Sequence, residues 1–169
     1  MTETLSPTLP PDVESLVMTV LKAACDRNLK LVTAESCTGG LLASLLTDVE
    51  GCAHAFERGF VVYTDEAKAD LLEVPEELLS RCGAVSAAVA EAMVHGAIAR
   101  SAGDVAVSIT GYAGRGGPGE EPGLVYFGLA RRDGEARVHE IHFGDIGRGA
   151  VRVKCLRQAL TMLRDEIGP

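Results

Sequence analysis

The sequence predicts a three-layer α/β/α fold, a single domain with a mixed sheet. Segments with helical periodicity alternate with short apolar runs of strand length, a pattern typical of α/β proteins. One Asp-Gly pair lies between two of the apolar runs and predicts a hairpin, so at least two strands are antiparallel. The hydrophobic fraction is 47% but aromatic residues are only 4%, which predicts a core of alanine, valine and leucine.

The first half of the chain is expected to alternate helix and strand after a disordered tail over residues 1–10. Residues 11–169 are expected to form the one domain. Apolar residues at helical spacing follow Pro11 as far as Asn28, and proline is favoured in the first turn of a helix. The next elements are a strand ending near Thr33, a helix over 38–46, a strand over 60–63, a short helix capped by Thr64 and another begun by Pro75.

The second half is expected to contain more strand. Ser86 is a favourable cap for an alanine-rich helix over 87–100. The turn at Asp133-Gly134 joins strands over 124–130 and 137–143. The remaining elements are a strand over 104–110, a glycine-rich loop over 111–123 and a closing helix over 151–167.

Composition and charge argue against several classes of function. The net charge of −8 disfavours a nucleic-acid partner, because phosphate binding needs clustered lysine and arginine. The five cysteines are scattered without a C-x-x-C pair, so neither a zinc site nor a disulfide framework is indicated. The N-terminus lacks the pattern of a signal peptide, and no apolar run approaches membrane-spanning length. We therefore expect a cytoplasmic protein with no metal site and no membrane partner.

The stretch over residues 33–40 is the first candidate site. It joins an apolar run to a helical one through small hydroxyl residues and two glycines, a turn that exposes backbone N–H groups at a helix N-terminus. The Thr38-Gly39-Gly40 turn is therefore a candidate anion site, and Ser36 a candidate nucleophile beside an oxyanion hole. The alternative is a hydroxyl cap with glycines for close packing.

Cys37 is the rival nucleophile at the same turn. A thiol near a helix N-terminus has a lowered pKa and is more reactive than a hydroxyl. The alternative is that it faces inward as a small apolar residue. Because successive residues in a tight turn point apart, we expect only one of Ser36 and Cys37 to face a ligand.

A serine nucleophile needs a general base. The four histidines have no motif around them, so each is more readily explained as structural. A lysine can serve instead if burial lowers its pKa, and Lys68 follows the predicted strand that ends at Tyr63. Both side chains are expected near Ser36, since ligands in open α/β sheets bind at the carboxyl ends of the strands. The alternative is that Lys68 pairs with Thr64 or Asp65 on an exposed helix face.

Two further segments offer groups that could bind an anion. Gly111 opens a glycine-rich loop whose N–H groups could approach a phosphate, although it lacks the pattern of a Walker or dinucleotide-binding loop. Arg148 and Arg152 lie four residues apart on one face of the last helix and could grip a phosphate or carboxylate. The alternatives are a mobile loop and an exposed arginine face.

Five segments, in order and at matching spacing, resemble the CinA C-terminal family, whose members include nicotinamide mononucleotide deamidases. The resemblance covers residues from about 12 to 165, and it is specific because the segments occur as an ordered set. The segments are Ala34–Gly40, Gly59–Tyr63 with Lys68, Gly83–Ser86, Ile109–Gly111 with Ala113-Gly114, and Gly123–Tyr126.

The resemblance implies hydrolysis of the carboxamide of nicotinamide mononucleotide to nicotinic acid mononucleotide and ammonia, without a metal or organic cofactor. A small nucleotide is then the expected partner, and we expect a homo-oligomer, a dimer or larger. Two other functions stay open: hydrolysis of another small amide at the same site, and nucleotide binding without catalysis.

The resemblance also assigns roles to individual residues. Ser36 matches the nucleophile, Lys68 and Tyr63 its partners, Thr110 a substrate-site threonine and Arg152 an arginine near the site. In the implied mechanism Lys68, with Tyr63, takes the proton from Ser36, and N–H groups of the Thr38-Gly39-Gly40 turn stabilise the oxyanion. The sequence departs from the family pattern at Asp65, Tyr112, Arg115, Glu121 and an insertion at Ile146-Gly147.

Overall fold

The structure, a computed structural model, describes residues 9–168. It confirms the predicted fold class: five strands form one mixed sheet in the order β2-β1-β3-β4-β5. The tail expected over residues 1–10 lies outside the described residues except for its last two.

The interior strand β1 (Leu31–Glu35) pairs in parallel with β2 (Phe56–Val61) and with β3 (Val105–Gly111). The antiparallel half of the sheet adds β4 (Leu124–Arg131) and β5 (Arg137–His142), which are joined by the predicted hairpin. The helices are α1 (Pro11–Asp26), α2 (Leu41–Leu45), α3 (Asp65–Leu72), α4 (Glu76–Cys82), α5 (Ala87–Ala99) and α6 (Arg148–Ile167), with a short 3-10 helix η2 (Ala53–Ala55).

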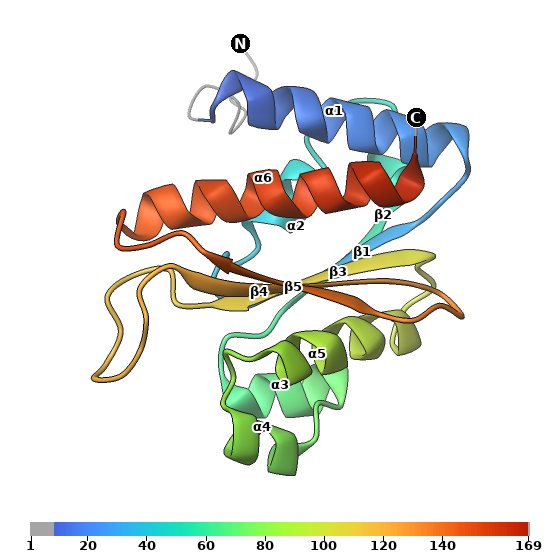
Figure 1. The fold of residues 1–169 in the computed structure, drawn as a ribbon. Helices are drawn as coiled ribbons and strands as arrows, with labels where there is room; N and C mark the ends of the chain where they lie inside the picture. Colours follow the sequence, from blue (N-terminus) through green and yellow to red (C-terminus); the bar gives the residue numbers. More distant parts are fainter. Residues whose placement is uncertain (1–8, 169) are drawn as a thin grey trace.

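Helices cover both faces of the sheet, as Figure 1 shows. α1, α2 and α6 pack on one face, and α3, α4 and α5 on the other. Every residue of β1 is buried, because a central strand of such a sheet has no solvent-facing side. The connections from β1 to β2 and from β2 to β3 run on opposite faces, which opens a crevice at the carboxyl ends of these strands.

Two helix starts form as their capping residues predict. The Thr64 hydroxyl oxygen accepts a hydrogen bond from Ala67 N at 3.1 Å, and the Ser86 hydroxyl oxygen accepts one from Val89 N at 3.3 Å. Such bonds satisfy N–H groups that have no partner within the helix. The start of α3 matters for function, because it places Lys68 at the end of the first helical turn.

Several predicted boundaries are wrong, among them the start of α2, which is Leu41 and not residue 38. β2 spans 56–61 and not 60–63, because it is an edge strand in which Glu57, Arg58 and Gly59 interrupt the apolar residues, so that pairing with β1 and not an apolar run defines it. α6 begins at Arg148 and not at residue 151, directly after Gly147 with φ 90°. Tyr63 therefore lies beyond its strand, and Arg148 lies in the first helical turn.

Gly96 lies where α5 packs against the end of α3. A Cβ at this position would be 2.0 Å from the carbonyl oxygen of Leu72, a backbone atom that cannot easily move aside. Gly96→Ala is therefore expected to lower the free energy of unfolding by about 1–3 kcal/mol, the usual cost of overpacking. Urea unfolding followed by circular dichroism measures this change.

Gly149→Ala in α6 is the matched control. A Cβ at Gly149 would meet no atom of the described chain within 4 Å, so the same change there is expected to cause no loss of stability. Equal destabilisation by the two variants would contradict the steric explanation.

Candidate active site

A cavity of about 260 Å³ opens at the carboxyl ends of β1, β2 and β3. Its walls come from the turn after β1, the start of α3, the loop before α5, the end of β3 with its following loop, and the start of α6. The lining residues are Ser36, Cys37, Tyr63, Lys68, Ala84, Val85, Thr110, Gly111, Tyr112, Ala113, Gly114, Arg115, Gly116, Glu120 and Arg148.

Ser36 is held by the sheet although it lies just beyond β1. Its N–H donates to the Ile109 carbonyl at 3.0 Å, which extends the β1–β3 pairing by one residue. Its carbonyl accepts from Gly39 N at 3.1 Å, which closes the turn. The side chain is 7% exposed, so its hydroxyl meets the cavity but little bulk water.

Lys68 is the largest polar side chain in the interior and is 1% exposed. Side chains of a helix lean toward its N-terminus, so Lys68 reaches back over the start of α3. There Nζ lies 3.2 Å from Ser36 Oγ and 3.1 Å from the carbonyl oxygens of Val62 and Tyr63. The structure therefore brings together the two residues that the sequence predicted as nucleophile and base.

Burial changes the protonation equilibrium of Lys68. Removal from water lowers the pKa of Lys68, against the opposing effects of Asp65 and of ionised Cys37. A neutral amine has two N–H donors and one lone pair. When the two N–H groups of a neutral Lys68 donate to the Val62 and Tyr63 carbonyls, the lone pair can accept the Ser36 proton, whereas a charged Nζ donates to Ser36 Oγ.

Glu35 has a structural role that the sequence analysis missed. Its fully buried carboxylate accepts hydrogen bonds from the N–H groups of Gly40, Leu42 and Ala43 at 3.1, 3.1 and 2.7 Å. The available signal was the absence of a capping side chain at Gly40, the residue before α2. Glu35 supplies that cap from the preceding strand and so anchors the turn on which Ser36 lies.

This cap corrects the predicted anion site at the Thr38-Gly39-Gly40 turn. The N–H of Gly39 donates to the Ser36 carbonyl and that of Gly40 to Glu35, so neither is free for an oxyanion. The Thr38 N–H is the one in this turn that has no acceptor among the described residues. Thr38 is fully buried, and none of the three turn residues lines the cavity, so the predicted anion site at this turn is not formed.

Tyr63 and Arg152 make contacts that the sequence did not predict. Tyr63 contributes its carbonyl oxygen to Lys68, while its side chain is 66% exposed at the cavity. Arg152 donates to the Thr38 carbonyl at 2.7 Å and packs against Gly39, behind the turn and not in the cavity. Tyr63 therefore contacts Lys68, and Arg152 contacts the turn that carries Ser36.

Thr110, Gly111 and Arg148 do line the cavity, as predicted. The Thr110 hydroxyl donates to the Ala84 carbonyl at 2.8 Å, which ties the loop before α5 to the end of β3. Arg148 reaches the cavity beside Gly114 and has no carboxylate partner among the described residues. The expected arginine pair is thus divided between the cavity and the turn. None of the four histidines, all within the described range, lines this cavity.

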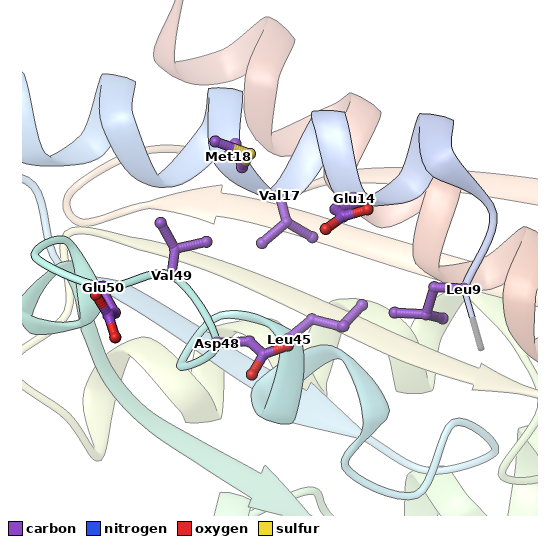
Figure 2. A pocket seen from close by; sticks show the side chains of 8 residues that line it. All are labelled: Leu9, Glu14, Val17, Met18, Leu45, Asp48, Val49 and Glu50. Carbon is purple, nitrogen blue, oxygen red and sulfur yellow. The ribbon is translucent and has the colours of Figure 1, made fainter. Parts of the chain in front are cut away.

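A second cavity of similar volume lies between α1 and the segment over 45–50, where Figure 2 shows its lining side chains. Its apolar floor is bordered by three carboxylates and by no basic residue of the described chain: Glu14, Asp48 and Glu50. Negative charge of this density disfavours an anionic ligand. The candidate nucleophile Ser36 and the candidate base Lys68 line the first cavity and not this one.

Within residues 9–168, every helix is too short or too polar to span a bilayer. The same range contains no group of three or more histidine, cysteine or acidic side chains placed to hold a metal ion.

His142 connects the loop after β3 to β5. Its Nδ1 lies 2.7 Å from a carboxylate oxygen of Glu121, and its Nε2 lies 2.8 Å from one of Glu140. The Glu121 contact, followed by that of Glu140, raises the pKa of His142 above the ordinary 6.5. Because the folded-state pKa is the higher one, this stabilisation is complete below the unfolded pKa and is lost as pH rises through the raised value.

Glu121→Gln is expected to lower the pKa of His142, because it removes the first of the two carboxylates. NMR titration of the imidazole signals measures this pKa directly. Glu77→Gln on α4 is the control and is expected to leave the value unchanged. An unaltered His142 pKa in Glu121→Gln would show that the contact is not maintained in solution.

The sequence and the fold are similar to those of known proteins. The model of the CinA C-terminal domain matches residues 13–167. The fold is similar to that of a competence/damage inducible protein from Agrobacterium tumefaciens, at 43% identity and a TM-score of 0.89, over 92% of this chain and 95% of that one. It is also similar to a competence damage-inducible protein from Klebsiella pneumoniae, at 35% identity and a TM-score of 0.86, over 92% and 96% of the two chains.

Curated relatives are similar in sequence but longer. The chain is 44% identical over 159 residues to a CinA-like protein of Akkermansia muciniphila and 42% identical over 159 residues to one of Thermosynechococcus vestitus. These matches cover 93% and 92% of this chain. The chain spans 38% of the length of each of these two relatives.

Proposed function

Because the chain belongs to the CinA C-terminal domain family, we propose that it hydrolyses the carboxamide of nicotinamide mononucleotide to nicotinic acid mononucleotide and ammonia. The observation that carries the proposal is the Ser36–Lys68 pair, with Oγ and Nζ 3.2 Å apart in the wall of the cavity. A buried lysine beside a serine hydroxyl is an arrangement that activates the serine for attack on an amide.

In the proposed reaction Lys68 acts first as a general base and then as a general acid. Neutral Lys68 accepts the proton of Ser36 while Oγ attacks the amide carbon, and negative charge develops on the former carbonyl oxygen. Lys68 then gives its proton to the amide nitrogen, and ammonia leaves. A water molecule, deprotonated by Lys68, hydrolyses the acyl-enzyme and releases the acid and Ser36.

The cavity mouth suits a charged nucleotide. Arg148 is unpaired within the described chain and begins α6, whose positive N-terminal end favours a phosphate. Arg115 is less available, because it pairs with Asp145 at 2.9 Å. The rings of Tyr63 and Tyr112 line the same cavity, and aromatic faces attract a cationic pyridinium ring.

The test is ammonia release from nicotinamide mononucleotide, with the acid product identified by chromatography. Nicotinamide riboside is the matched substrate, since it lacks only the phosphate, and it is expected to react much more slowly. Ammonia from another small amide but none from the nucleotide would assign a different amidohydrolase activity. Nucleotide binding without ammonia would indicate a non-catalytic nucleotide-binding protein.

A further inference from the structure

Cys37, the neighbour of Ser36, has a second thiol beside it. Its side chain is 7% exposed and lines the cavity, and it belongs to the same buried core cluster as Cys155 on α6, whose thiol is near enough to shift its pKa. α6 also reaches the same turn three residues earlier, where Arg152 donates to the Thr38 carbonyl. Residues three apart share a helix face, so α6 presents Arg152 and Cys155 together to the turn that carries Ser36.

We propose that Cys37 and Cys155 form an oxidation site, which hydrogen peroxide converts to a disulfide that inactivates the neighbouring Ser36. The effect on activity rests on the proposed function, whereas disulfide formation does not. Cys155 is fully buried and Cys37 lines the cavity, so the cavity is the route by which the oxidant enters.

The surroundings make the two thiols unequal. The Cys155 thiol, and to a smaller extent the Arg152 cation, lower the pKa of Cys37, against the opposing effects of burial and of Glu35. The same contact and burial raise the pKa of Cys155. Cys37 is also the thiol that lines the cavity, whereas Cys155 is fully buried, so Cys37 is the one that peroxide reaches first, as in paired thiols of redox motifs.

The reaction balances with peroxide as the only oxidant. The Cys37 thiolate attacks one peroxide oxygen, the O–O bond breaks, and Cys37 sulfenic acid and hydroxide form. The Cys155 sulfur then attacks the Cys37 sulfur, the S–O bond breaks, and hydroxide leaves with the Cys155 proton as water. The two thiols lose two hydrogens in total, and the peroxide is reduced to water.

The disulfide would disturb the candidate active site through the backbone. It links the residue after Ser36 covalently to α6, while Lys68 stays on α3 on the other face of the sheet. The Ser36–Lys68 distance of 3.2 Å then depends on how far the turn moves. A displacement of about 1 Å is enough to reduce a rate about 100-fold.

The test uses a chain in which the other three cysteines are replaced: Cys25→Ser, Cys52→Ser and Cys82→Ser. Their removal matters because Cys25 also contacts Cys52, and Cys82 is exposed. After peroxide treatment the intact mass is expected to fall by about two units, the mass of the two hydrogens lost. Peptide mapping should join residues 37 and 155, and dithiothreitol should reverse the change. Ammonia release should fall in proportion to the disulfide fraction and recover on reduction.

Cys155→Ala in the same background is the matched control. It is expected to keep ammonia release before oxidation and to give a sulfenic acid at Cys37, trapped by dimedone, in place of the disulfide. Absence of a disulfide between residues 37 and 155 after peroxide would overturn the site. A disulfide that leaves ammonia release unchanged would overturn inactivation. If the untreated protein releases no ammonia, the proposed function fails, and the mass measurement alone decides whether the site exists.

Discussion

Ser36→Ala is expected to reduce ammonia release from nicotinamide mononucleotide by at least about 1,000-fold, because it removes the proposed nucleophile. The backbone bonds from Ser36 to Ile109 and from Gly39 to Ser36 do not involve the hydroxyl. The variant should therefore fold and bind the nucleotide with nearly unchanged affinity, which calorimetry measures. Steady-state ammonia release gives the rate.

Cys37→Ala is the matched control for this variant. It changes the adjacent residue in the same turn by a similar volume, and it is expected to keep most of the ammonia release, since the hydroxyl and its base remain. Near wild-type turnover in Ser36→Ala would exclude Ser36 as nucleophile. Loss of turnover in a folded Cys37→Ala protein, with thiol alkylation blocked by substrate, would transfer the role to Cys37.

Lys68→Met is expected to lose activity as severely as Ser36→Ala, because methionine has a similar length but cannot accept a proton. The double variant should be little worse than either single one, since residues that act as a unit are not additive. Substantial ammonia release in Lys68→Met would contradict the assignment of the base.

The pH dependence of the wild-type rate tests the same assignment. Burial lowers the pKa of Lys68 from its ordinary 10.5, so the neutral base forms at a lower pH than in an exposed lysine. The rate is expected to rise with pH and to level off below that value. A flat profile across neutral and mildly alkaline pH, with chemistry limiting the rate, would contradict this mechanism.

The lowered pKa also has a consequence for stability. Below the folded-state pKa the protein carries a buried charge at a cost, and this cost is relieved as pH rises from the lowered pKa toward the unfolded 10.5. Lys68→Met is therefore expected to be at least as stable as the wild type at neutral pH. Thermal unfolding measures this and separates loss of catalysis from loss of fold.

Several elements follow from residues that are close in sequence. The starts of α3 and α5 are defined by Thr64 and Ser86, each of which bonds an N–H three residues ahead. The turn between β4 and β5 contains Asp133 with φ 64°, a conformation that Asp-Gly turns favour. These interactions join residues only a few positions apart. The sequence by itself therefore determined these boundaries and, with the apolar pattern, the α/β fold class.

The edge strand and the candidate site depended on tertiary structure. Residues 57–59 do not mark a strand until β1 lies beside them, and the cap that Glu35 supplies to α2 requires the chain to turn back on itself. Lys68 meets Ser36 across 32 residues, and Arg152 meets Thr38 across 114. Whether a charged side chain is exposed, or is buried with a shifted pKa, depends on what packs over it. The sequence therefore determined which groups can do the chemistry, and only the packing of α3 and α6 against the sheet decided which of them share a cavity.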